Sequence, residues 1–512
     1  MSSVVAKHYG FSAVSRSLRP FIIGKGFRLL VSVAVLILLA RHLSQKQYAV
    51  YISLQALIMI VGAISSVGVQ QAILRYMPEL RAIGNNLTMY RMLAIGMMLR
   101  AGLVASVMLL GLPFAGWLGE TFGIESWLWI LPWYAAVGVL RLSAMAMTQS
   151  LEALLWQKQA QYGMAIGGFT RLAGVLAFLI FGQLDLWAVL QIELFSEATS
   201  LLLMLLGWRS QRAADEHKHE GDPGWWAENR SRVFKFGAWS GLLNQTRILY
   251  GSAPNRLIAA HYLGVAELAI LGFADSLNNL AGRLMPTRLM MSMIRPVFMA
   301  HYSDRRDFDQ LVRLSNLVYR LNLIFLALPI VLLLIVGEPV FLWATANKYG
   351  AAAYLLAGFL ALMVAEGMRS TLELLVQAVE KNQILLTNLI QSASLFISIP
   401  LFEYIGLWAL VLVNIAGTVS ANAVVVMLLR QNGLKFHLDI GLILLILIYS
   451  VLSAIAGWWS LQEFNSYLFS ACIVVIVFIL CMFIKLPLHR NEKEMLKVLL
   501  MNQFGKKKNA SE

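Results

Sequence analysis

Residues 236–260 read FGAWSGLLNQTRILYGSAPNRLIAA, a stretch apolar enough to cross a membrane although it contains arginine and several polar residues. At helical spacing, Asn244, Arg247, Gly251 and Asn255 fall at i, i+3, i+7 and i+11, so they form one polar stripe on one face. Arg247 lies roughly 16 Å into the span, where a charge that faces lipid costs about 3 kcal/mol or more. The stripe is therefore predicted to face a protein partner, a water-filled cavity or a ligand.

The composition extends this reading to the whole chain. Hydrophobic residues make up 59% and charged residues 13% of the sequence, and its mean hydropathy is +0.70, whereas soluble domains average about 25% charged residues. We predict an all-α polytopic membrane protein with about fourteen transmembrane helices. The apolar stretches long enough to cross the bilayer are 21–41, 48–70, 92–117, 124–147, 160–182, 185–207, 236–260, 265–289, 316–337, 351–377, 383–404, 406–429, 438–460 and 465–486.

The distribution of lysine and arginine predicts the orientation, because cytoplasmic loops retain positive charge. With the N-terminus inside, the cytoplasmic segments hold roughly two dozen of these residues, and the opposite face holds only Arg41, Lys46 and Lys348. Both termini are therefore predicted to be cytoplasmic, and residues 1–20 lack the pattern of a cleaved signal peptide. The net charge of +14 then reflects topology and attraction to membrane lipids, and no nucleic-acid partner is expected.

The sequence also contains an internal repeat. Residues 43–49 match 263–269, and residues 186–188 match 407–409, at similar offsets. Each half has six spans and so begins on the same side of the membrane, which predicts two parallel repeats around a central cavity. The predicted parts are an N-terminal six-helix lobe 1–209, a cytoplasmic linker 210–235, a C-terminal six-helix lobe 236–430, helices 13 and 14 at 431–486, and a basic cytoplasmic tail 487–512.

Cations recur on the helix that opens each half. Lys25, Arg28 and Ser32 have the same i, i+3, i+7 spacing as Asn244, Arg247 and Gly251. Guanidinium groups form charge-assisted, often bidentate hydrogen bonds to phosphate oxygens, so these stripes are candidates for binding an anionic headgroup. For Lys25 and Arg28 the alternative is that they reach the nearby interface as long cationic side chains do.

Three further charged residues are candidates, and the first two have two interpretations each. Asp275 lies at a depth similar to that of Arg247 on the neighbouring predicted helix, and it either pairs with Arg247 or gates it for substrate. Arg369 either lines the cavity or pairs with Glu366 and Glu373 at i−3 and i+4. Arg100 lies within the third span without an obvious partner.

Other polar and small residues are better explained by helix packing. Arg171 in the fifth span is expected to pair with Glu193 and Glu197 in the sixth. The glycine pairs at 163 and 167, and at 237 and 241, have the i, i+4 spacing of close helix contacts.

Sequence motifs for enzymatic chemistry are absent. The chain contains no phosphate-binding loop of the Gly-x-x-x-x-Gly-Lys-Ser/Thr type, no His-Glu-x-x-His and no Gly-x-Ser-x-Gly motif. We therefore expect no catalytic residues, no metal and no cofactor. An integral enzyme that polymerises sugars or transfers acyl groups is an alternative, although the predicted outward loops are short.

The N-terminal part of the chain resembles a known family. The segments at 40–43 (ARHL), 48–51 (YAVY) and 75–79 (RYMPE) resemble the first two helices of the polysaccharide transporter family. Members are oligosaccharide flippases of the multidrug/oligosaccharidyl-lipid/polysaccharide exporter superfamily, and many carry glycine at the position of Ala49. The twelve-plus-two layout is similar as well.

The resemblance implies a function that the residues alone do not specify. It implies a multi-pass protein of the bacterial plasma (inner) membrane that moves polyprenyl-pyrophosphate-linked oligosaccharide to the outer leaflet by alternating access. It further implies a role in lipopolysaccharide or exopolysaccharide synthesis, with a polymerase and a chain-length regulator as partners. Two rivals stay open: a cation-coupled multidrug antiporter, against which the lack of a carboxylate in the first span counts, and a lipid II flippase.

Overall fold

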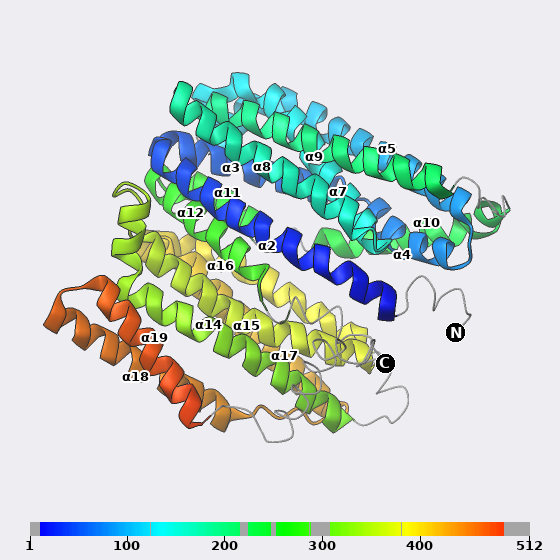
Figure 1. Ribbon diagram of the computed structural model, residues 1–512. Helices are drawn as coiled ribbons and strands as arrows, with labels where there is room; N and C mark the ends of the chain where they lie inside the picture. Colours follow the sequence, from blue (N-terminus) through cyan, green and yellow to red (C-terminus); the bar gives the residue numbers. More distant parts are fainter. Residues whose placement is uncertain are drawn as a thin grey trace, which may run out of the picture. The chain divides into compact units, whose positions relative to one another are not determined.

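The computed structural model describes residues 11–122, 124–215, 224–246, 252–285, 287, 308–379 and 381–485. Nearly all of these residues are helical, and the described residues contain no strand (Figure 1). Contacts divide the chain into two units, Met1–Phe273 and Ala274–Glu512. The boundary falls inside a helix, so the chain passes from one unit to the other without a loop.

The first unit is built from long helices joined by short connections. In chain order they are α2 (Phe11–His42), α3 (Gln45–Ile64), α4 (Val69–Ala82), α5 (Asn86–Gly111), η1 (Leu112–Phe114), α6 (Ala115–Phe122), η2 (Glu125–Ile130), α7 (Leu131–Ala153), α8 (Gln157–Phe181), α9 (Leu186–Asp215), α10 (Trp225–Thr246), α11 (Ser252–Tyr262) and α12 (Val265–Gly282), the last of which continues into the second unit.

The second unit holds the remaining helices. They are α14 (Phe308–Ala344), α15 (Ala352–Ala378), η5 (Asn382–Thr387), α16 (Asn388–Ile405), α17 (Trp408–Gln431), α18 (Ile440–Phe464) and α19 (Tyr467–Ile484). The last two form an antiparallel hairpin, drawn in orange and red in Figure 1.

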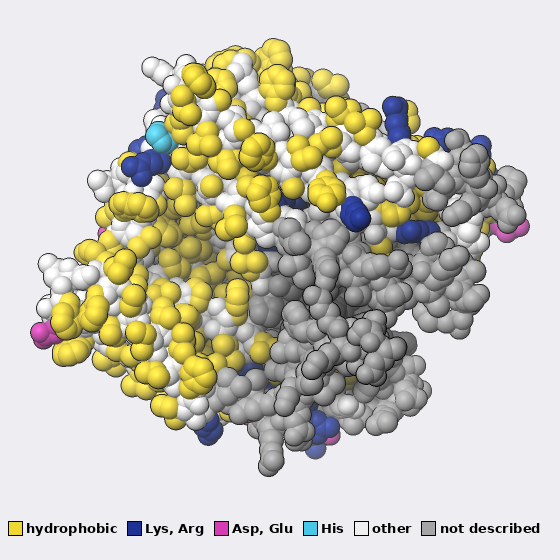
Figure 2. All heavy atoms as spheres, viewed as in Figure 1, with side chains coloured by type: hydrophobic (Ala, Val, Ile, Leu, Met, Phe, Trp, Pro, Cys, Tyr) yellow, Lys and Arg dark blue, Asp and Glu magenta, His cyan; other side chains and the backbone are white. Residues whose placement is uncertain are grey.

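Ten helical segments of the described residues are long and apolar enough to cross a membrane. The other four predicted spans coincide with α2, with α10 and α11, with α12, and with η5 and α16. Large hydrophobic side chains such as Phe181 and Phe483 are exposed, and hydrophobic side chains dominate the described surface visible in Figure 2. Such a surface is suited to lipid and not to water.

Helix starts follow from local side-chain chemistry. Ser44 and Gln47 form a capping box at the start of α3, in which each side chain accepts a hydrogen bond from the other residue's backbone N–H. The Asn85 side chain accepts from the backbone of Thr88 at the start of α5. These caps supply acceptors for backbone N–H groups that have no partner within the helix.

Glycines allow close helix crossings in the first unit. A Cβ atom at Gly167 would lie 1.7 Å from Ser200 Oγ and 2.9 Å from Ser196 O, and one at Gly163 would lie 2.5 Å from Met204 Cγ, so α8 packs directly against α9. A Cβ at Gly241 would lie 2.8 Å from the backbone nitrogen of Gly68. The predicted role of both glycine pairs in close packing is confirmed.

The second unit is organised around α14, which packs against α15, α18 and α19. Tyr319 and Leu323 of α14 form a buried cluster with Ile446 and Tyr449 of α18 and Phe478 of α19. The terminal hairpin is therefore attached through a hydrophobic core.

Candidate functional site

Four helices of the first unit place a cluster of charged side chains in its interior. Glu193 of α9, which is fully buried, lies 2.9 Å from Arg141 of α7 and 2.5 Å from Arg171 of α8. Tyr51 of α3 donates a hydrogen bond to the same carboxylate at 2.8 Å. Glu197, one turn along α9, accepts from Arg141 at 2.8 Å. We call these five residues the interior charge cluster.

The interior charge cluster is electrically balanced, since two guanidinium groups face two carboxylates. Buried charges are tolerated when they are paired and hydrogen-bonded, whereas a lone buried charge is costly. The predicted pairing of Arg171 with Glu193 is confirmed. Arg141 was missed as a site residue, because a partner 56 positions away leaves no signal in helical spacing.

Arg28 of α2 lies near this cluster. Its side chain is partly buried, and within the described part of the chain it makes no hydrogen bond or ion pair. The carboxylates of Glu152 and Glu197 are near enough to act on it electrostatically. Helix α2 packs against α8 and contains no acidic residue of its own. Arg28 therefore has two carboxylates in its vicinity and no direct partner among the described residues. Lys25, one turn earlier, is exposed.

Arg100 of α5 is hydrogen-bonded to the C-terminal end of α3. Its guanidinium donates to the carbonyl oxygen of Gly62 at 2.6 Å and to Ser65 Oγ at 3.1 Å. Both acceptors lie at the end of α3, where the last carbonyls have no partner within the helix and the helix dipole favours a cation. Arg100 thus caps α3 from α5, a role that was not predicted from the sequence.

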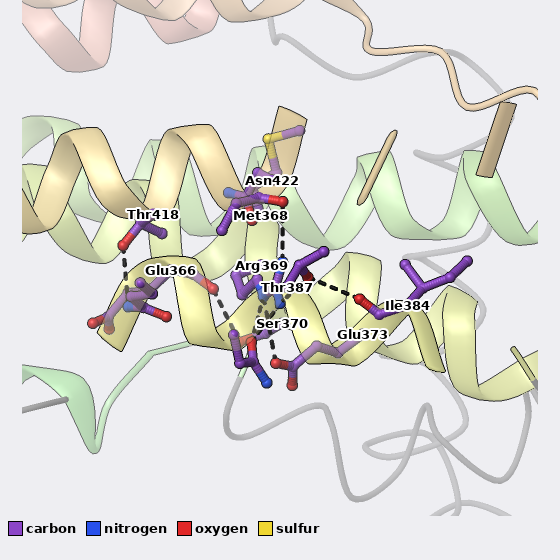
Figure 3. A network of polar contacts seen from close by, with 12 residues as sticks. Glu366, Met368, Arg369, Ser370, Glu373, Ile384, Thr387, Thr418 and Asn422 are labelled. Carbon is purple, nitrogen blue, oxygen red and sulfur yellow. Dashed lines mark hydrogen bonds and ion pairs between the residues drawn. The ribbon is translucent and has the colours of Figure 1, made fainter. Parts of the chain in front are cut away.

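Arg369 is likewise fully engaged in helix packing. It donates to Thr387 Oγ1 at 2.7 Å, to Asn388 Oδ1 at 3.0 Å and to the carbonyl of Ala421 at 3.3 Å, and it lies 3.6 Å from Glu373. Figure 3 shows Thr387 of η5 and Glu373 of α15 beside Arg369. Of its two readings, the pairing with Glu373 is the one that this geometry supports.

The remaining candidates lie around residues that the structure does not describe. Arg247 and the side chain of Asn244 are outside the described residues. Asn255 is buried, and among the described groups its Oδ1 has no hydrogen-bond partner. Arg256 beside it is also buried, although it was not predicted as a site residue. Asp275 is buried on α12, and its pairing with Arg247 stays a prediction.

Comparisons with known proteins identify the family and the fold. A family model described as polysaccharide biosynthesis protein matches residues 38–354. No curated protein matches the chain significantly. Among solved structures, the lipid II flippase MurJ in an inward closed conformation is similar, with a TM-score of 0.65 and 14% identity over 91% of this chain and 98% of that one.

Two further solved structures share this architecture. An inward-facing multidrug resistance MATE family transporter has a TM-score of 0.55 and 14% identity over 82% of this chain and 98% of that one. A transporter of the same superfamily from Pyrococcus furiosus has a TM-score of 0.50 and 15% identity over 84% of this chain and 98% of that one. The family match covers more than half of the chain, and the fold resembles that of these membrane transporters. The protein therefore belongs to the polysaccharide biosynthesis protein family.

Proposed function

We propose that this transporter flips polyprenyl-pyrophosphate-linked oligosaccharide units from the cytoplasmic to the outer leaflet of the bacterial plasma membrane, for surface polysaccharide synthesis. Transport proceeds by alternating access, and the polyprenyl tail stays in lipid while the headgroup crosses. The family match over residues 38–354 supports a cargo of this class.

Arg28 is the observation that carries the proposal. A partly buried guanidinium on an apolar helix, without a direct partner among the described residues, is suited to a diphosphate headgroup. The carboxylates of Glu152 and Glu197 lie near Arg28 but do not occupy its hydrogen-bond donors. The phosphate oxygens of an anionic cargo would accept hydrogen bonds directly from Arg28.

A flipping assay tests this role. The full chain is reconstituted into proteoliposomes with a fluorescent oligosaccharide on polyprenyl pyrophosphate, and arrival in the opposite leaflet is measured. Arg28→Ala should slow flipping by about 10-fold or more, given about 1.5–3 kcal/mol for a hydrogen bond to a charged group, and Arg28→Lys should retain part of the rate. Lys158→Ala, which removes an exposed cation of α8, is the matched control. Equal rates for Arg28→Ala and the control would refute the role of Arg28.

Arg247 provides a second test at the other predicted cationic stripe. Arg247→Glu should abolish flipping while membrane insertion and expression stay normal, because the reversed charge repels a diphosphate. Unchanged flipping by this variant would count against a substrate contact there.

A lipid II flippase is the second candidate, supported by the similarity to MurJ. Its cargo also combines a polyprenyl tail, a pyrophosphate and a sugar headgroup, so Arg28 would serve it equally. Competition between the two cargoes in the same proteoliposomes distinguishes them, since the cognate headgroup should inhibit transport of the other at lower concentration.

A further inference from the structure

Helix α10 has one buried and one exposed surface in the first unit. Trp225, Val233 and Gly237 are buried, and α10 packs against α4. The exposed residues combine aromatic rings with cations, as Phe234 is 70% and Trp239 61% exposed. We define the α10 outer surface by Trp226, Arg230, Phe234, Lys235 and Trp239.

Contacts with α4 hold this helix in place. Arg232 forms hydrogen bonds to both carboxylate oxygens of Glu79, at 3.0 and 3.3 Å, and its guanidinium lies 5.1 Å from the ring centroid of Tyr76. The hydrogen bond and the charge of Glu79 raise the pKa of Arg232. Tyr76 also packs edge-on against Trp225 at 6.3 Å. Arg232 is therefore used for attachment to α4.

Arg230 and Lys235 differ from Arg232 because they have no hydrogen bond or ion pair in the described part of the chain. Trp226, Arg230 and Phe234 follow at i, i+4 and i+8, and Lys235 and Trp239 at i and i+4, so each cation lies one turn from an aromatic ring. The rings of Trp226 and Phe234 lie 6.4 Å apart. This pairing of available cations with exposed aromatic rings is typical of segments at the membrane–water interface.

Neither the hydrocarbon core nor bulk water suits a helix surface that combines cations with exposed aromatic rings. The first half of α10 carries Glu228, Arg230 and Arg232, too many charges for the hydrocarbon core. Exposed tryptophan and phenylalanine disfavour a position in bulk water. At the interface, the rings enter the boundary of the acyl chains while the cations reach headgroup phosphates.

We propose that the α10 outer surface is a binding site for anionic phospholipid headgroups, with Arg230 and Lys235 contacting the phosphates and Trp226, Phe234 and Trp239 anchoring the helix at the interface. This proposal does not depend on the identity of the cargo. The partner is a phospholipid because apolar rings are interleaved on one exposed surface with cations that have no partner among the described residues.

Native mass spectrometry of the full chain in a neutral detergent tests the site. Phosphatidylglycerol and phosphatidylcholine are titrated separately, and the dissociation constant of the tightest adduct is measured. The wild-type chain should bind phosphatidylglycerol more tightly, and Arg230→Ala/Lys235→Ala should weaken it about 25-fold, since each cation near an anionic surface contributes about fivefold. Lys435→Ala, which removes an exposed cation elsewhere, should leave this constant unchanged.

Four outcomes would overturn the proposal. The first is equal affinity of the wild type for the two lipids, and the second is undiminished phosphatidylglycerol binding by the double variant. The third is an equal loss of binding in Lys435→Ala. The fourth is displacement of phosphatidylglycerol by an equal concentration of a short polyprenyl pyrophosphate, which would assign the surface to the cargo. Unchanged thermal unfolding of the double variant verifies that any loss is local.

Discussion

At the scale of single residues, Glu193 has the most demanding position in the first unit. One carboxylate without solvent access contacts Arg141 and Arg171 and accepts a hydrogen bond from Tyr51. Removing its charge leaves Glu197 as the one carboxylate of the cluster to balance two guanidinium groups, in an environment where charges are poorly solvated. The interior charge cluster therefore depends on this one acid.

Glu193→Gln preserves the shape of the side chain and removes the charge. We expect a loss of about 3–5 kcal/mol in unfolding free energy, measured by denaturant or thermal unfolding in detergent. Glu403→Gln, which neutralises an exposed acid, should have little effect. Adding Arg171→Met to Glu193→Gln should restore part of the loss, because the uncompensated positive charge is removed as well. Stability equal to that of the wild type in Glu193→Gln would contradict the assigned role.

Arg100 has contacts that assign it to helix capping and not to substrate. Arg100→Ala removes the 2.6 Å hydrogen bond to the carbonyl of Gly62 and leaves it, among the described residues, only the long one from Ser65 Oγ at 3.5 Å. We expect a loss of about 1–3 kcal/mol in stability. Arg91→Ala removes an exposed arginine of the same helix and is the control. Loss of flipping by Arg100→Ala with unchanged unfolding would instead assign Arg100 to the transport path.

At the scale of helices, the close crossing of α8 and α9 requires glycine at position 167. Gly167 and Gly168 are adjacent, yet a Cβ at Gly167 would overlap Ser200 Oγ and the carbonyl of Ser196, while one at Gly168 would meet only Val31 Cγ1, at 3.6 Å. The two positions have the same helical backbone and differ in what they face.

Alanine at each position separates packing from helix propensity. Gly167→Ala should destabilise the protein by about 1–3 kcal/mol because the helices must move apart. Gly168→Ala should be neutral or stabilising by up to about 1 kcal/mol, since alanine favours the helix. Thermal unfolding of both variants side by side measures the difference, and an equal effect would mean that α8 and α9 do not pack as described.

At the scale of the whole molecule, the terminal hairpin is joined to the second unit by an ion pair and a hydrophobic core. Arg320 of α14, whose side chain is 1% exposed, contacts Asp439 at 2.7 Å at the start of α18. Tyr319 of α14 also packs in a buried cluster with Ile446 of α18 and Phe478 of α19. The hairpin is thus part of the unit's core.

Truncation after Arg430 should therefore reduce both stability and flipping, because it exposes the apolar face of α14 and removes the carboxylate that faces Arg320. Asp439→Asn retains the hairpin and should cause a smaller loss in thermal unfolding. Flipping by the truncated chain at the wild-type rate would show that transport does not require helices 13 and 14.

Much of the architecture was predictable from local sequence. Hydropathy and length predict the spans, since a lipid-crossing helix needs about 20 apolar residues in a row. The spacing of Gly163 and Gly167 predicts the close crossing of α8 and α9, and the charges of Arg171 and Glu193 predict their pairing. Hydropathy and glycine spacing depend only on residues close in the sequence. A charge within a membrane span needs an opposite charge nearby, which limits its possible partners.

Tertiary structure decided which cations are compensated. Arg28 and Arg141 are both arginines within apolar helices, and the sequence alone does not separate them. Pairing requires atoms within about 4 Å, and helix packing brings Glu197 to Arg141 from 56 positions away. It leaves Arg28 without such a partner among the described residues, because the distance between side chains on different helices is set by how the helices pack and not by their order in the chain.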